Sequence, residues 1–388
     1  MRVKQARAPF ATDPRVVADE AAAVAAAWSA PGSPSSWRLT AAQFEVLRDD
    51  QELLAIAAMI PPDKLPALLF QAAAAFLVLE SEPQPLRDFF PRPGEPQPPL
   101  DARFRDEYRS FCLEHRDRLL ELSATHRYQM NEVGRCAGLV PALAAAGAAE
   151  RELALVDVGT GAGLALQFDR YSYHFNGPGG QVRTAGDPDS AVRIETEVRG
   201  GAPPPLPARL PRVSERIGID VEPLDVRDPE VRAWLAACIP QEIGAVTRFH
   251  HAVDVVTREP AQMVRGDVGD VLAGVLEAIP TERLVCLTDT YVNVFFAAEQ
   301  LRSFRALVAD AGATRDLDWV SIDPLVPLGA SASDNVLGLP TPPALVERNR
   351  RDGVFGVVGR LAYRDGHRSG GLLGLAHPGA AWLEWLAG

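Results

Sequence analysis

Acidic side chains recur where apolar segments of this sequence end, and the first of them precedes a glycine-rich turn. The run from Leu153 to Val158 is apolar, favours a buried strand, and carries Asp157 near its carboxyl end. Three glycines follow at alternate positions, Gly159, Gly161 and Gly163. Glycine adopts backbone angles that other residues avoid, and it lets a ligand approach the main chain closely. A strand that leads through such a turn into a helix is typical of a sheet edge that binds a nucleotide or a similar ligand.

The spacing of these glycines argues against two common nucleotide sites. A dinucleotide fingerprint needs its third glycine one residue later, and a phosphate-binding P-loop needs a lysine that is absent here. The pattern that remains is an acid followed by three alternating glycines. A glycine-rich turn that binds nothing is the alternative interpretation of this stretch taken alone.

Further acids stand at the ends of the next predicted strands. Asp220 lies in the apolar run 216–224, Asp267 ends 262–267, and Asp289 ends 283–289 with Thr288 before it. Because the carboxyl ends of parallel strands meet at one edge of a sheet, these groups are expected to lie near the glycine turn. The alternative is that each acid caps the helix that follows it.

This order of motifs resembles that of class I S-adenosylmethionine-dependent methyltransferases. The resemblance implies that Asp157 and the three glycines hold the amino-acid end of S-adenosylmethionine. It implies that Asp220, with Val221 beside it, meets the ribose hydroxyls, and that Asp267 meets the adenine amino group. Thr288 joins the cofactor-binding set, and Asp289 lies where that superfamily meets the methyl acceptor.

A longer set of motifs resembles an uncharacterised bacterial family of unknown function, DUF2332. The motifs include 125–135 (THRYQMNEVGR), 158–164, 168–171, 186–190 and 218–225. The resemblance extends from about residue 15 to about residue 385, and the family is methyltransferase-like where any activity is ascribed to it. The chain departs from the expected pattern after the fourth strand, where Thr288-Asp289-Thr290 replaces a histidine–serine pair. An inherited catalytic role is therefore in question there.

In methyl transfer the enzyme aligns the acceptor with the methyl group and, for an oxygen or nitrogen acceptor, also removes a proton. The candidate catalytic residues are Asp289, His126 and Glu132. The candidate acceptor-binding residues are Tyr128, Asn131, Arg135, Tyr171 and Tyr173. Simpler roles remain open: His126 as a partly buried histidine, Glu132 as a cap-region acid, and the tyrosines at 171 and 173 as ordinary strand aromatics.

Composition limits the partners and the compartment. The formal net charge of −12 argues against nucleic acid, whose phosphates need a basic face. The longest apolar run, 65–79, is too short to span a bilayer, and Met1–Arg7 is not followed by the apolar core of a signal peptide. The cysteines and histidines show no metal-ligand spacing, so no metal is expected. These features predict a cytoplasmic protein acting on a small molecule, with its oligomeric state undetermined.

The elements predict an α/β protein with two domains. Residues 1–150 are expected to form a helical cap, with helices at 13–30, 40–60, 65–80, 101–123 and 132–146. Residues 151–388 are expected to form a Rossmann-like, methyltransferase-like domain with a mostly parallel sheet, a C-terminal antiparallel hairpin and a lid-like insertion at about 168–215.

The function expected from these features is methyl transfer from S-adenosylmethionine to a small-molecule acceptor held between the cap and the sheet edge. The alternatives are an enzyme that uses the same fold and cofactor for other chemistry, and a non-catalytic module that binds a metabolite or a protein.

Overall fold

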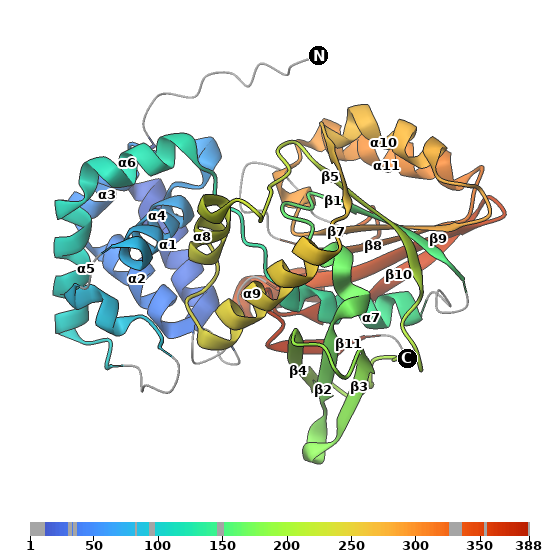
Figure 1. The fold of residues 1–388 in the computed structure, drawn as a ribbon, viewed down its shortest axis with the longest axis horizontal. Coiled ribbons are helices and arrows are strands. Elements are labelled where there is room, and N and C mark those ends of the chain that lie inside the picture. Colours follow the sequence, from blue (N-terminus) through green and yellow to red (C-terminus); the bar gives the residue numbers. More distant parts are fainter. Residues whose placement is uncertain are drawn as a thin grey trace. The chain divides into compact units, whose positions relative to one another are not determined.

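A computed structural model describes residues 12–29, 33, 37–81, 84–92, 98–145, 151–325, 336–352 and 355–386. Met1–Arg7, weighed above as a targeting segment, lies outside these residues. The chain divides into two compact units (Figure 1). The helical unit comprises Met1–Asn131 and Asp228–Thr247, and the sheet unit comprises Glu132–Arg227 and Arg248–Gly388.

The helical unit is built around α4, a helix with apolar residues on all sides. Its helices are α1 (Pro14–Ser29), α2 (Arg38–Asp49), α3 (Gln51–Ala57), α4 (Pro66–Glu80), α5 (Ala102–Glu114), α6 (Arg116–Thr125) and α8 (Pro229–Ala237). Short 3-10 turns occur at Pro62–Lys64 and Pro85–Phe89. Thirteen of the fifteen residues of α4 are buried, as its composition predicts.

The helix predicted over 40–60 is in fact two helices. Asp50 between them is extended, and its carboxylate accepts hydrogen bonds from the amides of Glu52 (2.9 Å) and Leu53 (3.0 Å). An N-cap of this kind starts a new helix.

The described residues of the sheet unit form eleven strands in one sheet. They are β1 (Leu153–Val158), β2 (Ser172–Asn176), β3 (Val182–Gly186), β4 (Arg193–Arg199), β5 (Val213–Asp220), β6 (Gln262–Arg265), β7 (Leu284–Thr290), β8 (Leu317–Pro324), β9 (Gly356–Arg364), β10 (His367–Ala376) and β11 (Trp382–Trp385). Their spatial order is β3-β2-β4-β11-β10-β9-β8-β7-β1-β5-β6. The five strands β6-β5-β1-β7-β8 are parallel and follow the order 3-2-1-4-5, which makes this half Rossmann-like.

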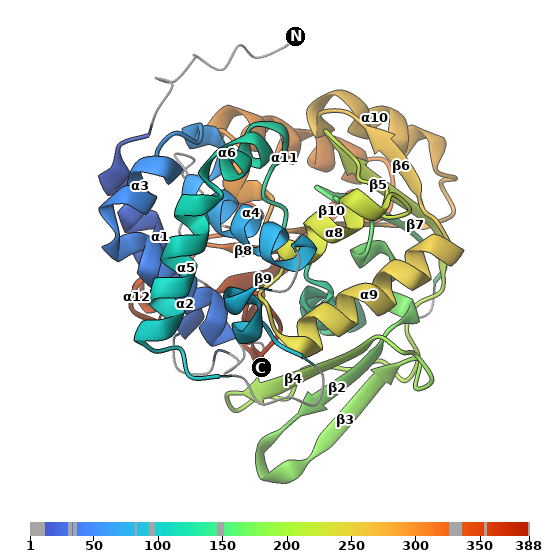
Figure 2. The ribbon, with the colours of Figure 1, turned by 60° about the vertical axis from the view of Figure 1, so that its left-hand side comes forward.

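Helices cover both faces of this parallel half (Figures 1 and 2). The helices α10 (Val268–Ala278) and α11 (Ala298–Gly312) share a core with Ala154, Val156 and Val158 of β1. On the opposite face, α7 (Cys136–Ala144) packs so closely that a Cβ on Gly138 would lie 2.7 Å from Ile322 of β8. The strands are therefore buried on both faces, which explains their continuous apolar sequences.

The insertion is not a lid. Its strands β2, β3 and β4 continue the same sheet, because β4 pairs in parallel with β11 (Figure 1). The C-terminal hairpin β9–β10 is antiparallel as predicted, but it lies inside the sheet rather than at its edge. The alternating aromatic and polar residues of 167–175 predict a strand, but the chain forms the 3-10 turn Ala165–Arg170 first and becomes a strand only at Ser172.

Several elements were not predicted. These are β11 and the helices α9 (Ile243–Arg258) and α12 (Pro343–Asp352). The boundary expected at 150 also differs from the observed units, because α7 packs on β8, β9 and β10 whereas α8 packs on α4. Short 3-10 turns also occur in the sheet unit at Val133–Arg135, Pro178–Gly180 and Asn293–Phe295.

Candidate functional site

The strand order identifies the edge where a ligand would bind. On one side of β1 the strands follow in the order β5 and β6, and on its other side in the order β7 and β8. The direction in which successive strands are added therefore reverses between β1 and β7. Open α/β sheets bind ligands outside the carboxyl ends of their strands at such a switch point. Asp157 and the glycine turn end β1, and Thr288 and Asp289 end β7 beside them, with Val158 paired with Asp289.

The glycine turn has the backbone conformation that its sequence predicts. Gly159, Gly161 and Gly163 have φ angles of 67°, 58° and 75°, a region that favours glycine. Several amides of the turn bond within the protein: Gly159 N donates to Ile219 O (2.8 Å), and Gly163 N donates to Thr160 O (2.9 Å). The amides of Gly159 and Gly163 are therefore not available to hydrogen-bond an anion.

Asp220 hydrogen-bonds the glycine turn and also lies at the carboxyl edge of the sheet. One carboxylate oxygen accepts from Gly161 N (2.9 Å), and the other accepts from Glu222 N (2.9 Å). Each oxygen keeps a further lone pair for a ligand hydroxyl. Val221, the next residue, is a 66% exposed apolar side chain at this edge.

A second feature of the glycine turn is that it is covered by a side chain. A Cβ on Gly159 would lie 2.5 Å from a methyl group of Val292, which follows β7. The segment after β7 therefore packs directly on the first glycine.

Asp157 is buried and hydrogen-bonded. Thr288 Oγ1 donates to Asp157 Oδ1 (2.7 Å). Burial raises the pKa of Asp157 to about 7, although the hydrogen bond from Thr288 opposes the shift. Asp157 thus holds the end of β1 to the end of β7.

Asp289 belongs to a closed network of buried polar groups. Its oxygens accept from Ser321 Oγ (2.6 Å), Asn293 Nδ2 (2.9 Å) and Trp319 Nε1 (2.5 Å). Asp323 lies beside it, and burial raises the pKa of both carboxyls, that of Asp323 well above its usual range. Two carboxylates this close cannot both stay ionised out of water, so the pair retains a proton.

This network bears on the proposed role of Asp289 as a base. Asp289 has no exposed surface, so in this conformation it cannot contact an acceptor. Asp267 has a simpler observed role: it is exposed, and it caps α10 by accepting from Gly269 N (2.9 Å). Across the described ranges, no cluster of three histidine, cysteine or acidic side chains is placed to hold a metal ion.

Glu132 and Arg135 lie just ahead of α7. The Glu132 carboxylate accepts from Gly134 N (2.8 Å) and from Arg248 (3.2 Å), with 1% of its side chain exposed. It caps the short turn Val133–Arg135, the role left open by the sequence. Arg135 instead stacks on the ring of Tyr291, with its guanidinium carbon 4.3 Å from the ring centre.

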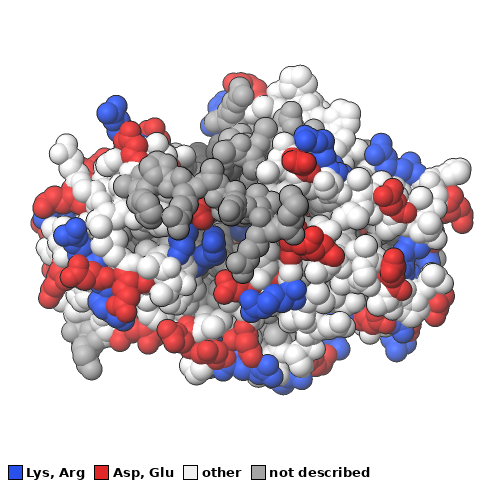
Figure 3. Space-filling model, turned by 90° about the horizontal axis from the view of Figure 1, so that it is seen from above, with Lys and Arg blue, Asp and Glu red and all other residues white. Residues whose placement is uncertain are grey.

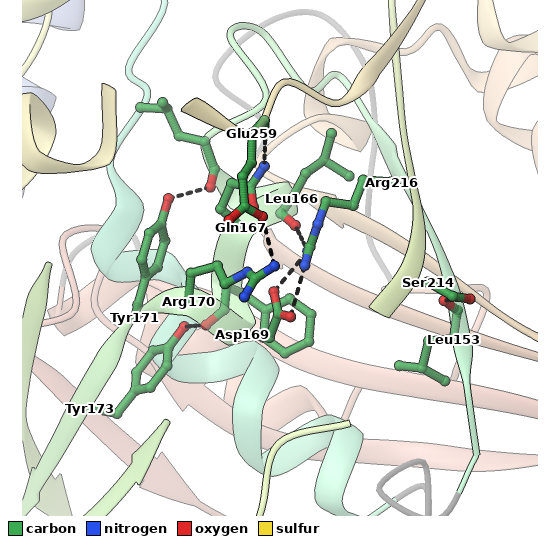
Figure 4. Close-up of polar contacts among 12 residues, drawn as sticks. Leu153, Leu166, Gln167, Asp169, Arg170, Tyr171, Tyr173, Ser214, Arg216 and Glu259 are labelled. Atoms are coloured by element: carbon green, nitrogen blue, oxygen red, sulfur yellow. Dashed lines mark hydrogen bonds and ion pairs between the residues drawn. The ribbon is translucent and has the colours of Figure 1, made fainter. Parts of the chain in front are cut away.

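Tyr171 and Tyr173 are fully buried and fasten the segment after the glycine turn (Figure 4). Their hydroxyls donate to the backbone oxygens of Leu164 (2.6 Å) and Phe168 (2.6 Å). This arrangement favours the alternative that they are ordinary strand aromatics rather than acceptor contacts.

An ion pair fixes the same segment to β5. The guanidinium of Arg216 donates to both oxygens of Asp169 (2.7 and 2.8 Å) (Figure 4). Both side chains are nearly buried, at 11% and 13% exposed, so the pair is little screened by water.

His126, Tyr128 and Asn131 belong to the helical unit. His126 ends α6, and its ring lies 4.3 Å from that of Trp234. Tyr128 packs against the core of the helical unit, and Asn131 Nδ2 reaches Gln129 O at 3.5 Å. The proposed roles of these three residues in acceptor binding remain predictions.

Three residues beside the site were not singled out from the sequence. The sequence also predicts a fifth strand over 318–323, and Asp323 ends it as another strand-end acid, so its position was a usable signal. Tyr291 has a φ of 59°, which is unusual for an aromatic residue, and Val292 covers Gly159. Neither feature has a sequence signature, because both depend on contacts between distant segments.

The surface shows no concentration of one charge where residues are described on the face in Figure 3, since basic and acidic side chains are interspersed there. No helix in the described ranges combines the length and apolar character needed to cross a membrane. The four cysteines are buried and unpaired.

Comparison with known proteins identifies a family but no activity. No curated protein matches the chain. A family model described as "Uncharacterized protein conserved in bacteria (DUF2332)" matches residues 18–385. Since this match covers nearly the whole sequence, the chain belongs to the bacterial family DUF2332.

Proposed function

We propose that the carboxyl edge of β5, β1 and β7 binds S-adenosylmethionine and that the protein transfers its methyl group to a small molecule. One observation carries the proposal. The glycine turn, with three positive φ angles, ends the first strand of a 3-2-1-4-5 sheet and is bonded to Asp220 at the end of the second. An acid on the second strand beside a glycine turn on the first is the combination that resembles class I methyltransferases.

The residues at this edge suit the parts of that cofactor. The remaining lone pairs of Asp220 can accept from two adjacent ribose hydroxyls, and the exposed side chain of Val221 can lie against a flat base. Asp267 follows β6, which lies beside β5, and the resemblance puts it in reach of the base. Bound there, S-adenosylmethionine would supply an electrophilic methyl group for in-line displacement.

One side chain has to move for this fit. Val292 occupies the space above Gly159, so a ligand that approaches the first glycine must displace its methyl groups. Val292 is only partly buried and follows a short loop, so a change of its rotamer is a local adjustment.

Calorimetric titration with S-adenosylmethionine and S-adenosylhomocysteine tests the proposal. We expect micromolar binding that weakens about 10- to 100-fold in Asp220→Asn, because a charged hydrogen-bond acceptor is lost. The matched control is Asp225→Asn, which removes the same charge from an exposed position in the same loop. Folded wild-type protein that binds neither ligand would refute the proposal.

A second candidate, a module that binds the cofactor without transferring its methyl group, is favoured by the burial of Asp289 and Glu132. Neither carboxylate reaches the solvent to act as a base. Incubation of the protein with methyl-labelled S-adenosylmethionine and a bacterial metabolite extract separates the two. Transfer of label to a small molecule supports the enzyme, whereas binding with no transfer supports the module. The free cysteines suit the reducing cytoplasm, where we expect either function to operate.

A further inference from the structure

Arg135 has its guanidinium held in place by uncharged groups. Its Nε donates to the backbone oxygen of Pro378 (3.2 Å). Its planar group lies over the ring of Tyr291, with the guanidinium carbon 4.3 Å from the ring centre. These two contacts fix the orientation of the side chain and leave the two terminal nitrogens of the fork to bind something else.

Several other poorly exposed arginines of the sheet unit have acidic partners, whereas the terminal nitrogens of Arg315 donate instead to four backbone oxygens. Arg216 pairs with Asp169, Arg248 with Glu132, and Arg360 with Asp318. Among the described residues, Arg135 forms no ion pair, although it is itself partly buried. A partly desolvated guanidinium without a counter-charge is costly, and an anion would offset that cost.

The contacts of Arg135 place it at the edge where the parallel strands end. Tyr291 directly follows β7. Pro378 follows β10, whose last residue, Ala376, pairs with Gly356, and Gly356 pairs in turn with Pro324 at the end of β8.

A short chain of contacts joins this position to the glycine turn. Arg135 stacks on Tyr291, and the next residue, Val292, packs on Gly159. Tyr291 keeps this position through a left-handed backbone with φ of 59°, a conformation that costs free energy for an aromatic residue. Its amide is anchored to Ile322 O (2.8 Å).

We propose that Arg135 binds an anionic oxygen group, a carboxylate or a phosphate, on the methyl acceptor. That the bound anion is a methyl acceptor rests on the proposed function. The anion site itself rests only on the contacts of Arg135. The flat fork of a guanidinium donates two parallel hydrogen bonds to either group, and the stacked ring keeps that fork from rotating. The substrates expected are small acids or phosphate esters.

The simpler alternative is that Arg135 only fastens the turn at Pro378 to Tyr291. Both roles predict some loss of stability on mutation, so stability alone does not separate them. Saturable binding of an anion that depends on Arg135 does.

The experiment is a titration of the full-length protein with acetate, benzoate, inorganic phosphate and phenyl phosphate. Ionic strength is held constant with sodium chloride, and binding is followed by calorimetry and by the shift in melting temperature. We expect at least one probe to bind saturably, with the carboxylate and phosphate arms showing which group is preferred. Affinity should fall about 10- to 100-fold in Arg135→Gln and less in Arg135→Lys, which keeps the charge but loses the fork.

The matched control is Arg227→Gln, an exposed arginine paired with Asp225, which should bind the probe as wild type does. Failure of all four probes to bind saturably would overturn the inference, and so would equal binding by folded Arg135→Gln protein. The same titrations run beside S-adenosylmethionine separate the two proposals. Cofactor binding without anion binding refutes only the role of Arg135, and anion binding without cofactor binding refutes only the methyltransferase.

Discussion

Carboxyl groups at the ends of β1, β7 and β8 are buried at a depth where ionisation is unfavourable. Asp289 and Asp323 share one network with Asn293 and Ser321, and Asp323 also accepts from the amide of Asn293 (3.2 Å). A protonated Asp323 can donate to Asp289, so the retained proton becomes part of the folded structure. The proton thereby links folding to pH.

The sign of this linkage follows from the raised pKa values. Unfolded aspartates titrate near pH 4, so above that pH the unfolded chain has released protons that the folded state still holds. Stability is therefore lost as pH rises, for Asp157 between about 4 and 7 and for the coupled pair from about 4 upward. This direction is opposite to that of an ion-paired aspartate.

We predict that Asp323→Asn flattens the pH dependence of stability. The amide can donate to Asp289 as the protonated acid does, without taking up a proton. The free energy of unfolding, measured with urea at pH 5, 7 and 9, should fall less steeply than in wild type, by up to about 1.4 kcal/mol per pH unit. Asp225→Asn should leave the slope unchanged, because Arg227 lowers the pKa of Asp225 to about 2. An unchanged slope in Asp323→Asn would rule out the shared proton.

The sequence predicted that acids stand at the ends of strands, but not which side chains hydrogen-bond them. Asp157, Asp220 and Asp289 are visible as acids in apolar runs, and the conformation of the glycine turn was confirmed. Their partners, such as Thr288 for Asp157, come from neighbouring strands whose register is a long-range property. Burial of Asp289 was therefore beyond the reach of local sequence patterns.

At the scale of secondary-structure elements, the loops that follow the adjacent strands β1 and β7 pack against each other. The turn after β1 presents Gly159, and the segment after β7 presents Val292, which fills the space a Cβ would need. The strands themselves were predictable, because apolar runs bounded by acids and glycines mark them. The packing between their loops was not, since it depends on which strands are neighbours.

We predict that Gly159→Ala lowers the free energy of unfolding by about 1–3 kcal/mol, through backbone strain at φ of 67° and overlap with Val292. In a Val292→Ala background the same change should cost less, mainly the strain of about 1 kcal/mol, because only the Cβ of residue 292 remains, 3.3 Å from the added Cβ. Gly179→Ala is the control for strain alone, because its φ is 72° and no atom lies within 4 Å of the added Cβ. Additive effects of the two changes in a double-mutant cycle would contradict this contact.

At the scale of the whole molecule, sequence order and spatial order diverge. The strands β2–β4 come between β1 and β5 in the chain, yet they extend the opposite end of the sheet through β11. Likewise α8 lies between β5 and β6 in sequence but belongs to the helical unit. Local patterns revealed most of these elements but not their partners, because pairing over such separations leaves no local signal.

Trp234 shows how α8 joins the helical unit. Its ring lies 5.6 Å from that of Phe76 in α4 and 4.3 Å from that of His126, and its Nε1 donates to Arg127 O (2.9 Å). Only 4% of the residue is exposed. The helical unit therefore depends on a side chain supplied from the middle of the sheet unit's sequence.

We predict that Trp234→Ala destabilises the helical unit by about 3–5 kcal/mol, the usual cost of emptying a buried tryptophan site. Hydrogen exchange should speed up at the amides of α4 and α6 and stay unchanged in β1 and β7, because the cavity opens in the core that α4 and α8 share. The converse control is Trp382→Ala, which removes a buried tryptophan from the sheet unit and should leave α4 protected. Equal loss of protection in α4 and β1 for either variant would mean that the two units unfold as one, and that the division seen in the contacts has no counterpart in stability.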